Sequence, residues 1–456
     1  MSSQHQQSSR RRTSSPLSVP VSGWLSSYRR TLVNGFQRLH AAIVSHGKHS
    51  TYVSLLPWRS PRVLTNPRSR SERRTASEDT SASDEDDEEP SFWVSNLWPV
   101  LDSMLAHGQY TAPRRHELGG FFAEQIAPFF GPEPSRDPTT GRLIPVWKSF
   151  MTDDFTPLEP SWTWKRGSAQ PVVKFSAEAV PRSNTASGAL DIAAQFADAL
   201  NTCDAKHLQF DRTALSTVVD LLTTPVGSVQ STSDTEQGST ALSQVMMGFD
   251  IHHNKTAVKA YILPTLRARA TGQSKLNVIT SAVRACGAGA CWENVFAYLS
   301  SQPNADPFLL AIDCADLAIA RFKVYVRFPT SNIDLLLQHV SLGGRIPLSA
   351  KFIRAIRDLW TRLSADSDDS DGLYRVASQT SGGTPMYFSV ERSAALPTPK
   401  FYIPVRLLGW DDHRVAKTVS QWLTAHGNPE AGRSYIAALQ AVRYVPQLHP
   451  SSVITD

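Results

Sequence analysis

The chain has 456 residues, of which 41% are hydrophobic and 19% charged, a composition typical of globular proteins with a sizeable core. Its formal net charge of +5 is compatible with an anionic ligand but too small to indicate nucleic-acid binding. The four cysteines lack metal-binding spacing, no apolar run approaches the roughly 20 residues that span a bilayer, and the N-terminus lacks the apolar core of a secretion signal. These features predict a reduced, cytoplasmic protein without a membrane segment.

The first 90 residues differ in composition from the rest of the chain. Residues 1–83 are rich in Ser and Arg and poor in acidic residues, and an acidic run, Asp84–Glu89, follows them. Such charge blocks bury too little apolar surface to offset the entropy of ordering, so we predict a disordered tail over residues 1–90. A mitochondrial transit peptide is the alternative, because such peptides share this composition.

Residues 91–456 form one predicted α+β domain. Helical spacing of apolar residues covers 92–106 and 116–130, and Gly131-Pro132 ends the second helix. Further helices are expected over residues 191–200, 211–222, 275–300, 332–340, 350–363 and 413–426. Strand-like runs cover residues 172–180, 245–251, 258–263, 308–314, 322–328, 386–391 and 400–407. Helix pairs that alternate with hairpins predict a sheet covered by helices.

Three hairpins repeat one pattern, in which an acidic residue ends the first strand and Lys-x-Tyr opens the second. The copies run from Asp250 to Lys259-Ala-Tyr261, from Asp313 to Lys323-Val-Tyr325, and from Glu391 to Lys400-Phe-Tyr402. Residues two apart on a strand share a face, so each hairpin presents an ammonium beside a phenol. If the sheet closes into a barrel, the three hairpins line its lumen.

One Lys-x-Tyr on an edge strand is ordinary surface chemistry, but three copies in matching hairpins favour a shared ligand site. Ammonium groups neutralise a diphosphate, and each aromatic ring face stabilises a carbocation by about 0.5–2 kcal/mol. An allylic diphosphate that ionises needs both kinds of group. The repeat therefore indicates an allylic diphosphate as the ligand.

From about Phe92 onward, the sequence resembles the fungal dimethylallyltryptophan synthase family of aromatic prenyltransferases. The resemblance rests on these hairpins, on Phe129-Phe-Gly-Pro-Glu-Pro134, and on Asp154-Phe-Thr-Pro-Leu-Glu-Pro-Ser-Trp-Thr-Trp164. It implies the ABBA fold, a ten-stranded antiparallel barrel ringed by helices, with the substrates in the lumen. It also implies transfer of a dimethylallyl group from dimethylallyl diphosphate to an indole acceptor (tryptophan, a cyclic dipeptide or an indole alkaloid) without an obligatory metal or cofactor.

The resemblance also implies roles for single residues. Glu159 matches the glutamate that accepts a hydrogen bond from the indole N–H. The implied diphosphate-binding cations are Lys174, Lys259, Arg321, Lys323 and Lys400, and the implied carbocation shield is Tyr261, Tyr325 and Tyr402. Magnesium-dependent prenyl synthases hold their metal on Asp-rich helices, whereas Asp368-Asp-Ser-Asp371 here is expected to be a solvated turn.

The domain departs from the family pattern in three places along the chain. Lys174 stands where an arginine is usual, which keeps the charge but loses the bidentate fork. Gln244 and Met246 occupy the neighbourhood of a lysine proposed as proton acceptor in tryptophan-modifying members, and no base replaces it. Lys400 stands where glutamine is frequent. The second departure argues against prenylation of free tryptophan at C4 and leaves other acceptors or other ring positions open.

The C-terminal strands that close the barrel in this family are not evident here. Tyr435 begins such a strand, and Arg443 and Tyr444 are candidate substitutes for the late cation and ring, but the pattern does not continue. We therefore expect irregular last strands. Two alternatives follow: a degenerate barrel that binds an isoprenoid or aromatic ligand without catalysis, and a phenol or tyrosine prenyltransferase. The expected partners are small molecules, and a monomer and a homodimer both stay open.

Overall fold

The computed structural model describes residues 91–139, 143–152, 154–165, 170–182, 186–224, 243–364, 383–405 and 410–443, and the backbone of two strands within residues 38–58. All of them belong to the second of two units into which the chain divides, residues 36–456. The architecture below is that of this unit.

Eleven of the described strands belong to one closed sheet. Their order is β10 (Asp306–Asp313), β11 (Phe322–Phe328), β12 (Thr384–Val390), β13 (Thr398–Pro404), β1 (Arg38–His46), β2 (Ser50–Trp58), β5 (Leu158–Lys165), β6 (Pro171–Ala177), β8 (Val245–Ile251), β9 (Thr256–Ile262) and β7 (Leu208–Gln209). Since β9 also pairs with β10, ten antiparallel strands close into a barrel, and β7 pairs parallel with β9 beside it. β3 (Ser135–Arg136) and β4 (Leu143–Ile144) form a separate ribbon. The predicted α+β barrel is confirmed.

Alternate residues on each strand face the lumen and the surrounding helices. On β6, Val173 and Phe175 are buried in the outer core, whereas Lys174 between them is only half-buried. This period of two follows from the pleat of an extended chain. The outer face of the barrel is therefore apolar, and polar side chains are left for the inner face.

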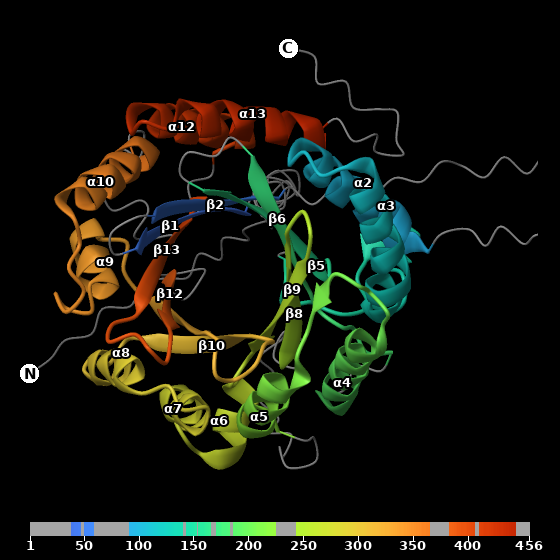
Figure 1. The fold of residues 1–456 in the computed structure, drawn as a ribbon, viewed down its shortest axis with the longest axis horizontal. Helices are drawn as coiled ribbons and strands as arrows, with labels where there is room; N and C mark the ends of the chain where they lie inside the picture. The colour runs from blue at the N-terminus through green and yellow to red at the C-terminus, as the bar shows by residue number, and fades with distance from the viewer. Residues whose placement is uncertain are drawn as a thin grey trace, which may run out of the picture. The chain divides into compact units, whose positions relative to one another are not determined.

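Helices surround the strands on all sides in a view along the barrel (Figure 1). Apolar stripes hold them there; on α10, Phe352, Ile356, Leu359 and Leu363 recur at helical spacing and are buried. The helices are α2 (Phe92–His107), α3 (Ala112–Phe121), α4 (Ala186–Thr202), α5 (Arg212–Leu222), α6 (Thr265–Thr271), α7 (Lys275–Ala285), α8 (Ala290–Ser300), α9 (Ile333–Val340), α10 (Ala350–Ser364), α12 (Asp412–Ala425) and α13 (Pro429–Arg443).

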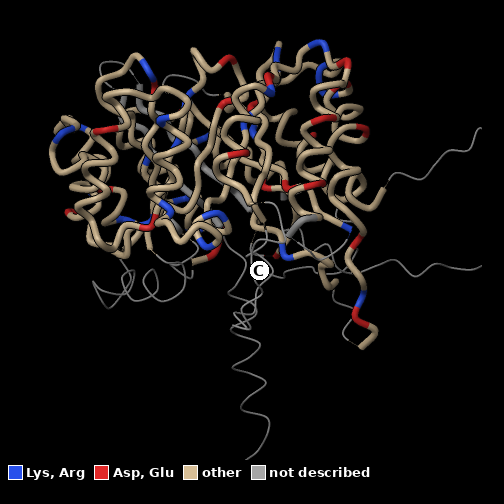
Figure 2. Tube along the Cα trace, turned by 90° about the horizontal axis from the view of Figure 1, so that it is seen from below, with Lys and Arg blue, Asp and Glu red and all other residues tan. Residues whose placement is uncertain are grey.

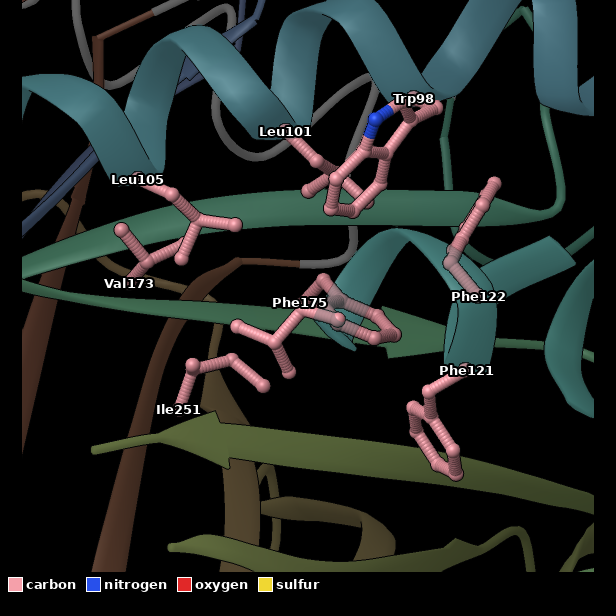
Figure 3. A pocket seen from close by; sticks show the side chains of 9 residues that line it. Trp98, Leu101, Leu105, Phe121, Phe122, Val173, Phe175 and Ile251 are labelled. Carbon is pink, nitrogen blue, oxygen red and sulfur yellow. The ribbon is translucent and has the colours of Figure 1, made fainter. Parts of the chain in front are cut away.

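A small apolar pocket lies in the layer between the helices and the outer face of the barrel (Figure 3). It is lined by side chains from α2, α3, η1 (Phe122–Ile126), β6 and β8: Trp98, Leu101, Leu105, Leu118, Phe121, Phe122, Val173, Phe175 and Ile251. The lining carries no charged side chain. We interpret it as a packing gap in the core, separate from the charged lumen.

The N-terminal region differs from its prediction. Residues 38–46 and 50–58, which the composition assigned to a disordered tail, form β1 and β2. β1 pairs with β13 and β2 pairs with β5, so this hairpin completes the ring of strands. The unpaired edges of β13 and β5 supply the backbone partners that a short hairpin lacks by itself. The rest of residues 1–90 lies outside the described residues, and its disorder stays a prediction.

The C-terminal region differs as well. Tyr435, predicted to begin a barrel strand, lies in the helix α13. Its ring is fully buried and meets Trp164 on the outer face of β5 at 5.6 Å between centroids. Tyr435, Ala438, Leu439 and Val442 recur at helical spacing, and this stripe packs on the core. Arg443 is the last residue of the same helix, and Tyr444 lies outside the described residues.

Charge is mixed over the described surface. Figure 2 shows Lys and Arg interspersed with Asp and Glu along the helices and loops. None of the helices in the described part of the chain combines the length and the apolar character that crossing a bilayer requires.

Candidate active site

Two aspartates in the lumen each bind a pair of cations. Lys174 on β6 and Lys259 on β9 both contact Oδ2 of Asp250, and the Lys174 Nζ distance is 3.1 Å. The strand register produces this arrangement, since Lys174 stands directly opposite Asp250 across the β6–β8 ladder. The pleat then turns both side chains to the same face.

The second aspartate, Asp313, repeats the pattern on the neighbouring strands. Its Oδ1 lies 2.9 Å from Nζ of Lys323, and its Oδ2 lies 2.7 Å from Nε of Arg321. Asp313 also stands opposite Lys259 across the β9–β10 ladder, so the two clusters are contiguous. Four cations against two carboxylates give this part of the lumen a net positive charge.

The pKa values reflect this crowding. Burial, and next the charge of Lys259, lowers the pKa of Lys323 to about 8. Burial would raise the pKa of Asp313, but Lys323, Lys259 and Arg321 hold it at about 2. Burial also lowers the pKa of Lys174, and the charge of Asp250 offsets part of this shift. A bound polyanion would relieve the repulsion among these cations.

Lys400 on β13 is a fifth cation in the lumen. Its Nζ lies 5.0 Å from the ring centroid of Tyr402 and 5.7 Å from that of Tyr387. Burial, and next the charges of Lys174 and Lys259, lowers the pKa of Lys400 well below the usual lysine value. The structure therefore brings all five predicted cations within electrostatic reach of one another.

Four tyrosine rings lie beside these cations. Tyr325 is central: its centroid lies 5.0 Å from that of Tyr387, 6.2 Å from Tyr402 and 6.3 Å from Tyr261. Burial raises the pKa of all four phenols, so they are neutral at physiological pH. The three predicted tyrosines are thus brought together.

Tyr387 was not among the predicted residues. It lies on the first strand of its hairpin, whereas Lys-x-Tyr marks the second, so the repeat does not include it. The alternation of side chains along a strand could have identified it, because Tyr387 and Ser389 lie on the same face of β12. In the structure, this face pairs with the face of β11 that carries Lys323 and Tyr325.

Glu159 lies on the inner face of β5, opposite Ser176 on β6, and its side chain is half-buried. Burial is the main cause of the raised pKa of Tyr261 and of Tyr402, and the negative charge of Glu159 is a smaller cause that acts in the same direction. The predicted glutamate therefore faces the tyrosine cluster. A carboxylate there can accept a hydrogen bond from a ligand that stacks on the rings.

An apolar cluster adjoins the tyrosines. Met246, Leu263, Leu309 and Ala311 from the barrel pack with Met151, and Tyr261 and Tyr325 contact this cluster together with Phe150 and Phe308. Met246, one of the two residues near the position of the proton-accepting lysine in related sequences, is therefore part of an apolar cluster. Gln244 instead accepts a hydrogen bond from the backbone N–H of Thr224 (3.0 Å), outside the cluster.

Glu178 holds the segment that supplies Met151. This fully buried carboxylate accepts hydrogen bonds from Trp147 Nε1 (3.0 Å), Ser149 Oγ (2.7 Å), the Phe150 backbone N–H (2.7 Å) and Ser243 Oγ. Its own backbone N–H donates to the carbonyl of Pro157, just before β5. Sequence reasoning missed this residue, because its partners come from segments distant in the chain.

No three His, Cys, Asp or Glu side chains of the described residues gather in a way that could hold a metal ion. Asp368–Asp371 and Asp84–Glu89 lie outside the described residues. The two late candidate positions, Tyr435 and Arg443, belong to the helix α13 and not to a barrel strand. Tyr435 packs outside the barrel and is therefore separate from the lumenal cluster.

Comparison with known proteins agrees with this geometry. A family model for tryptophan dimethylallyltransferase matches residues 89–438. A 4-O-dimethylallyl-L-tyrosine synthase from Claviceps purpurea is 30% identical over 389 residues, covering 81% of this chain and 84% of that protein. A 7-dimethylallyltryptophan synthase from Aspergillus fumigatus is 26% identical over 367 residues, covering 76% and 77%. The crystal structure of AnaPT from Neosartorya fischeri matches the fold with a TM-score of 0.63 at 17% identity, covering 77% of this chain and 86% of that one.

Proposed function

Because the chain belongs to the tryptophan dimethylallyltransferase family of aromatic prenyltransferases, we propose that it transfers a dimethylallyl group from dimethylallyl diphosphate to an indole acceptor. The observation that carries the proposal is a cluster of five cations beside four tyrosine rings in one lumen, where Lys400 lies over two of the rings and Glu159 faces them. An ionising allylic diphosphate requires these two kinds of group side by side.

The first step breaks the C–O bond of the donor, and its electron pair leaves with the diphosphate. Lys174, Lys259, Arg321, Lys323 and Lys400 would stabilise this leaving group by charge-assisted hydrogen bonds. Burial, and next the charges of neighbouring lysines, lowers the pKa of Lys323 and Lys400, and a bound anion would offset both effects. The cations would hold the diphosphate without a divalent metal.

The dimethylallyl cation would then lie among Tyr261, Tyr325, Tyr387 and Tyr402. Their ring faces stabilise positive charge without offering a nucleophile, and neutral phenols are retained because burial raises their pKa. The rings also exclude water, which would convert the cation into dimethylallyl alcohol.

The acceptor ring attacks the cation, a C–C bond forms, and loss of the ring proton restores aromaticity. Glu159 would accept a hydrogen bond from the indole N–H, which enriches the ring in electrons and fixes its orientation. The proton acceptor for the last step is open, because Met246 offers no base at the site where one was sought.

A tyrosine acceptor is the second candidate. Its support is the 30% identical relative, which is named for dimethylallylation of L-tyrosine at its oxygen. With this acceptor, Glu159 would take the phenol proton, and the phenol oxygen would form the new bond to the cation. The same donor site serves both reactions.

The test is incubation of the purified protein with dimethylallyl diphosphate, a metal chelator and a panel of tryptophan, tyrosine, and cyclic dipeptides that contain either residue. Mass spectrometry should detect the gain of one C5H8 unit on at least one of them. Glu159→Ala should abolish transfer while binding of a thiolodiphosphate analogue of the donor persists. Donor binding without transfer to any acceptor would instead indicate a barrel that binds without catalysis.

A further inference from the structure

Residues 147–152, which we call the strap, reach the lumen at the end away from the cation clusters. Phe150 and Met151 of the strap pack in one apolar cluster with side chains of the barrel, namely Met246, Leu263, Leu309 and Ala311. Tyr261 and Tyr325 contact this cluster, whereas the lysine of each Lys-x-Tyr comes two residues earlier on the same strand. The strap therefore meets the tyrosine rings from the end of the lumen opposite the cations.

Glu178, directly after β6, holds the strap in place. Its carboxylate accepts hydrogen bonds from Trp147 Nε1 (3.0 Å), Ser149 Oγ (2.7 Å) and the Phe150 backbone N–H (2.7 Å). Ser149 Oγ in turn accepts a hydrogen bond from the backbone N–H of Met151 at 3.1 Å. The carboxylate thus fixes the middle of the strap, either directly or through one hydroxyl.

The hydrogen-bond donors of Glu178 are neutral. Asp250 and Asp313 each pair with two cations, whereas the four hydrogen bonds to Glu178 come from an indole, two hydroxyls and a backbone amide. Burial raises the pKa of Glu178, and these hydrogen bonds oppose that shift. An apolar side chain would fill the space without the cost of burying a carboxylate. A carboxylate fixes the direction of its donors, which apolar packing does not, because hydrogen bonds are directional.

Glu178 also fixes the strand that carries Glu159. Its backbone N–H donates to the carbonyl of Pro157 at 2.8 Å, which continues the β5–β6 ladder past the pair of Leu158 and Ala177. Glu159 comes two residues after Pro157. One residue therefore links the strap to the glutamate that faces the tyrosine rings.

We propose that Glu178 is a positioning residue for the acceptor: it holds Phe150 and Met151 across the lumen, so that an aromatic acceptor rests against the strap with its ring toward the tyrosines, and water is kept out. This inference rests on the proposed function and adds a residue that acts without touching either substrate. When the strap loosens, the oxygen of a water molecule adds to the dimethylallyl cation and loses a proton, so dimethylallyl alcohol forms in place of the prenylated acceptor. Donor binding should persist, because the cation clusters are built on Asp250 and Asp313.

The test compares two serines that donate to the same carboxylate. Ser149 belongs to the strap, whereas Ser243 lies just before β8, so Ser149→Ala and Ser243→Ala each remove one hydroxyl from Glu178 but only the first releases the strap. Four quantities are measured for both variants and for Glu178→Gln. They are hydrogen exchange at the strap, the KM of the acceptor, the fraction of donor converted to dimethylallyl alcohol, and binding of the thiolodiphosphate analogue by calorimetry.

We expect Ser149→Ala to raise hydrogen exchange at the strap, the acceptor KM and the alcohol fraction by about 5- to 10-fold each, because one buried hydrogen bond is lost. Glu178→Gln should change the same three quantities in the same direction. Ser243→Ala should leave them within about 2-fold of the wild type, and all three variants should bind the donor analogue within about 2-fold of the wild type.

Equal effects of the two serine variants on the acceptor KM and the alcohol fraction would overturn the inference, because Glu178 would then act through stability alone. Faster hydrogen exchange at the strap with an unchanged KM and alcohol fraction would overturn it as well. If the wild type transfers the dimethylallyl group to no acceptor, the proposed function fails, and calorimetric binding of tryptophan and tyrosine replaces the KM. Weaker binding in Ser149→Ala alone would then support the positioning role, and equal binding in both serine variants would overturn it.

Discussion

The ring of Tyr261 lies directly over the Cα of Gly248, on the neighbouring strand. A Cβ built on Gly248 would approach Cε2 of that ring to 2.5 Å, which is closer than real contacts allow. Gly248 also stands opposite Lys259. The absence of a side chain there lets the phenol and the ammonium of one Lys-x-Tyr hairpin lie side by side.

Gly248→Ala should therefore displace Tyr261 from the cluster. We expect a fall of about 10-fold or more in kcat/KM, because one ring no longer covers the cation. The fraction of donor lost to dimethylallyl alcohol should rise, and product analysis by mass spectrometry measures both effects. Gly120→Ala is the control, since its new Cβ would meet no atom closer than 3.9 Å. Unchanged product partition in Gly248→Ala would contradict the role of Tyr261.

Donor binding should weaken in alkaline solution. Burial, and next Lys259, lowers the pKa of Lys323 to about 8, so its ammonium loses its proton as pH rises through that value. The pH profile of kcat/KM for the donor, measured between about pH 6 and 10, reports this pKa of the free enzyme. Lys323→Met should lower kcat/KM at neutral pH by about 10-fold and remove this alkaline limb. Lys417→Met, at an exposed site on α12, should leave the profile unchanged.

The same pKa has a consequence for stability. Between about pH 8 and the usual lysine value, the folded chain binds fewer protons at Lys323 than the unfolded chain. The contribution of Lys323 to the free energy of unfolding therefore rises with pH in this window. Denaturant titrations of the wild type and Lys323→Met should show a difference in the free energy of unfolding that changes in this direction, and the opposite slope would contradict a pKa lowered by burial.

Glu178→Ala should lower the free energy of unfolding by about 3 kcal/mol, because the donors of Trp147, Ser149 and Ser243 lose their buried acceptor. Glu178→Gln should cost less, since one oxygen remains. Denaturant titration measures both. Glu293→Ala, at an exposed ion pair on α8, should have little effect. Equal stabilities of Glu178→Ala and the wild type would mean that this network does not anchor the Met151 segment.

Two truncations test how the barrel closes. Removal of residues 1–35 deletes the first unit and should leave folding and activity intact. Removal of residues 1–60 also deletes β1 and β2, which leaves β13 and β5 as open edges. We expect this variant to aggregate or to lose thermal stability, as seen by light scattering and calorimetry. Full activity after the longer truncation would show that the barrel closes by other means.

The alternation of helical and strand-like segments predicted the fold class, and the Lys-x-Tyr repeat predicted most of the cluster. The repeats of 3.6 residues in a helix and 2 residues in a strand are local properties of the chain. The sequence therefore shows that Lys323 and Tyr325 lie on the same face of their strand. A signal for β1 and β2 was also present: two β-rich runs lie on either side of Gly47, but the composition of the surrounding tail obscured it. The helical spacing of Tyr435, Ala438, Leu439 and Val442 is also visible in the sequence, but the family pattern predicts a strand there.

The sequence by itself determined which side chains each hairpin contributes to the lumen, since the pleat alone sets that choice. Only the tertiary structure decided which strands close the ring and which distant groups meet. Backbone hydrogen bonding is the same for any pair of edges, so the pairing of β1 with β13 depends on the whole fold. The contacts of Tyr387 with Tyr325, of Arg327 with Phe308, and of Glu178 with its four donors likewise arise from strand register and packing between segments far apart in the chain.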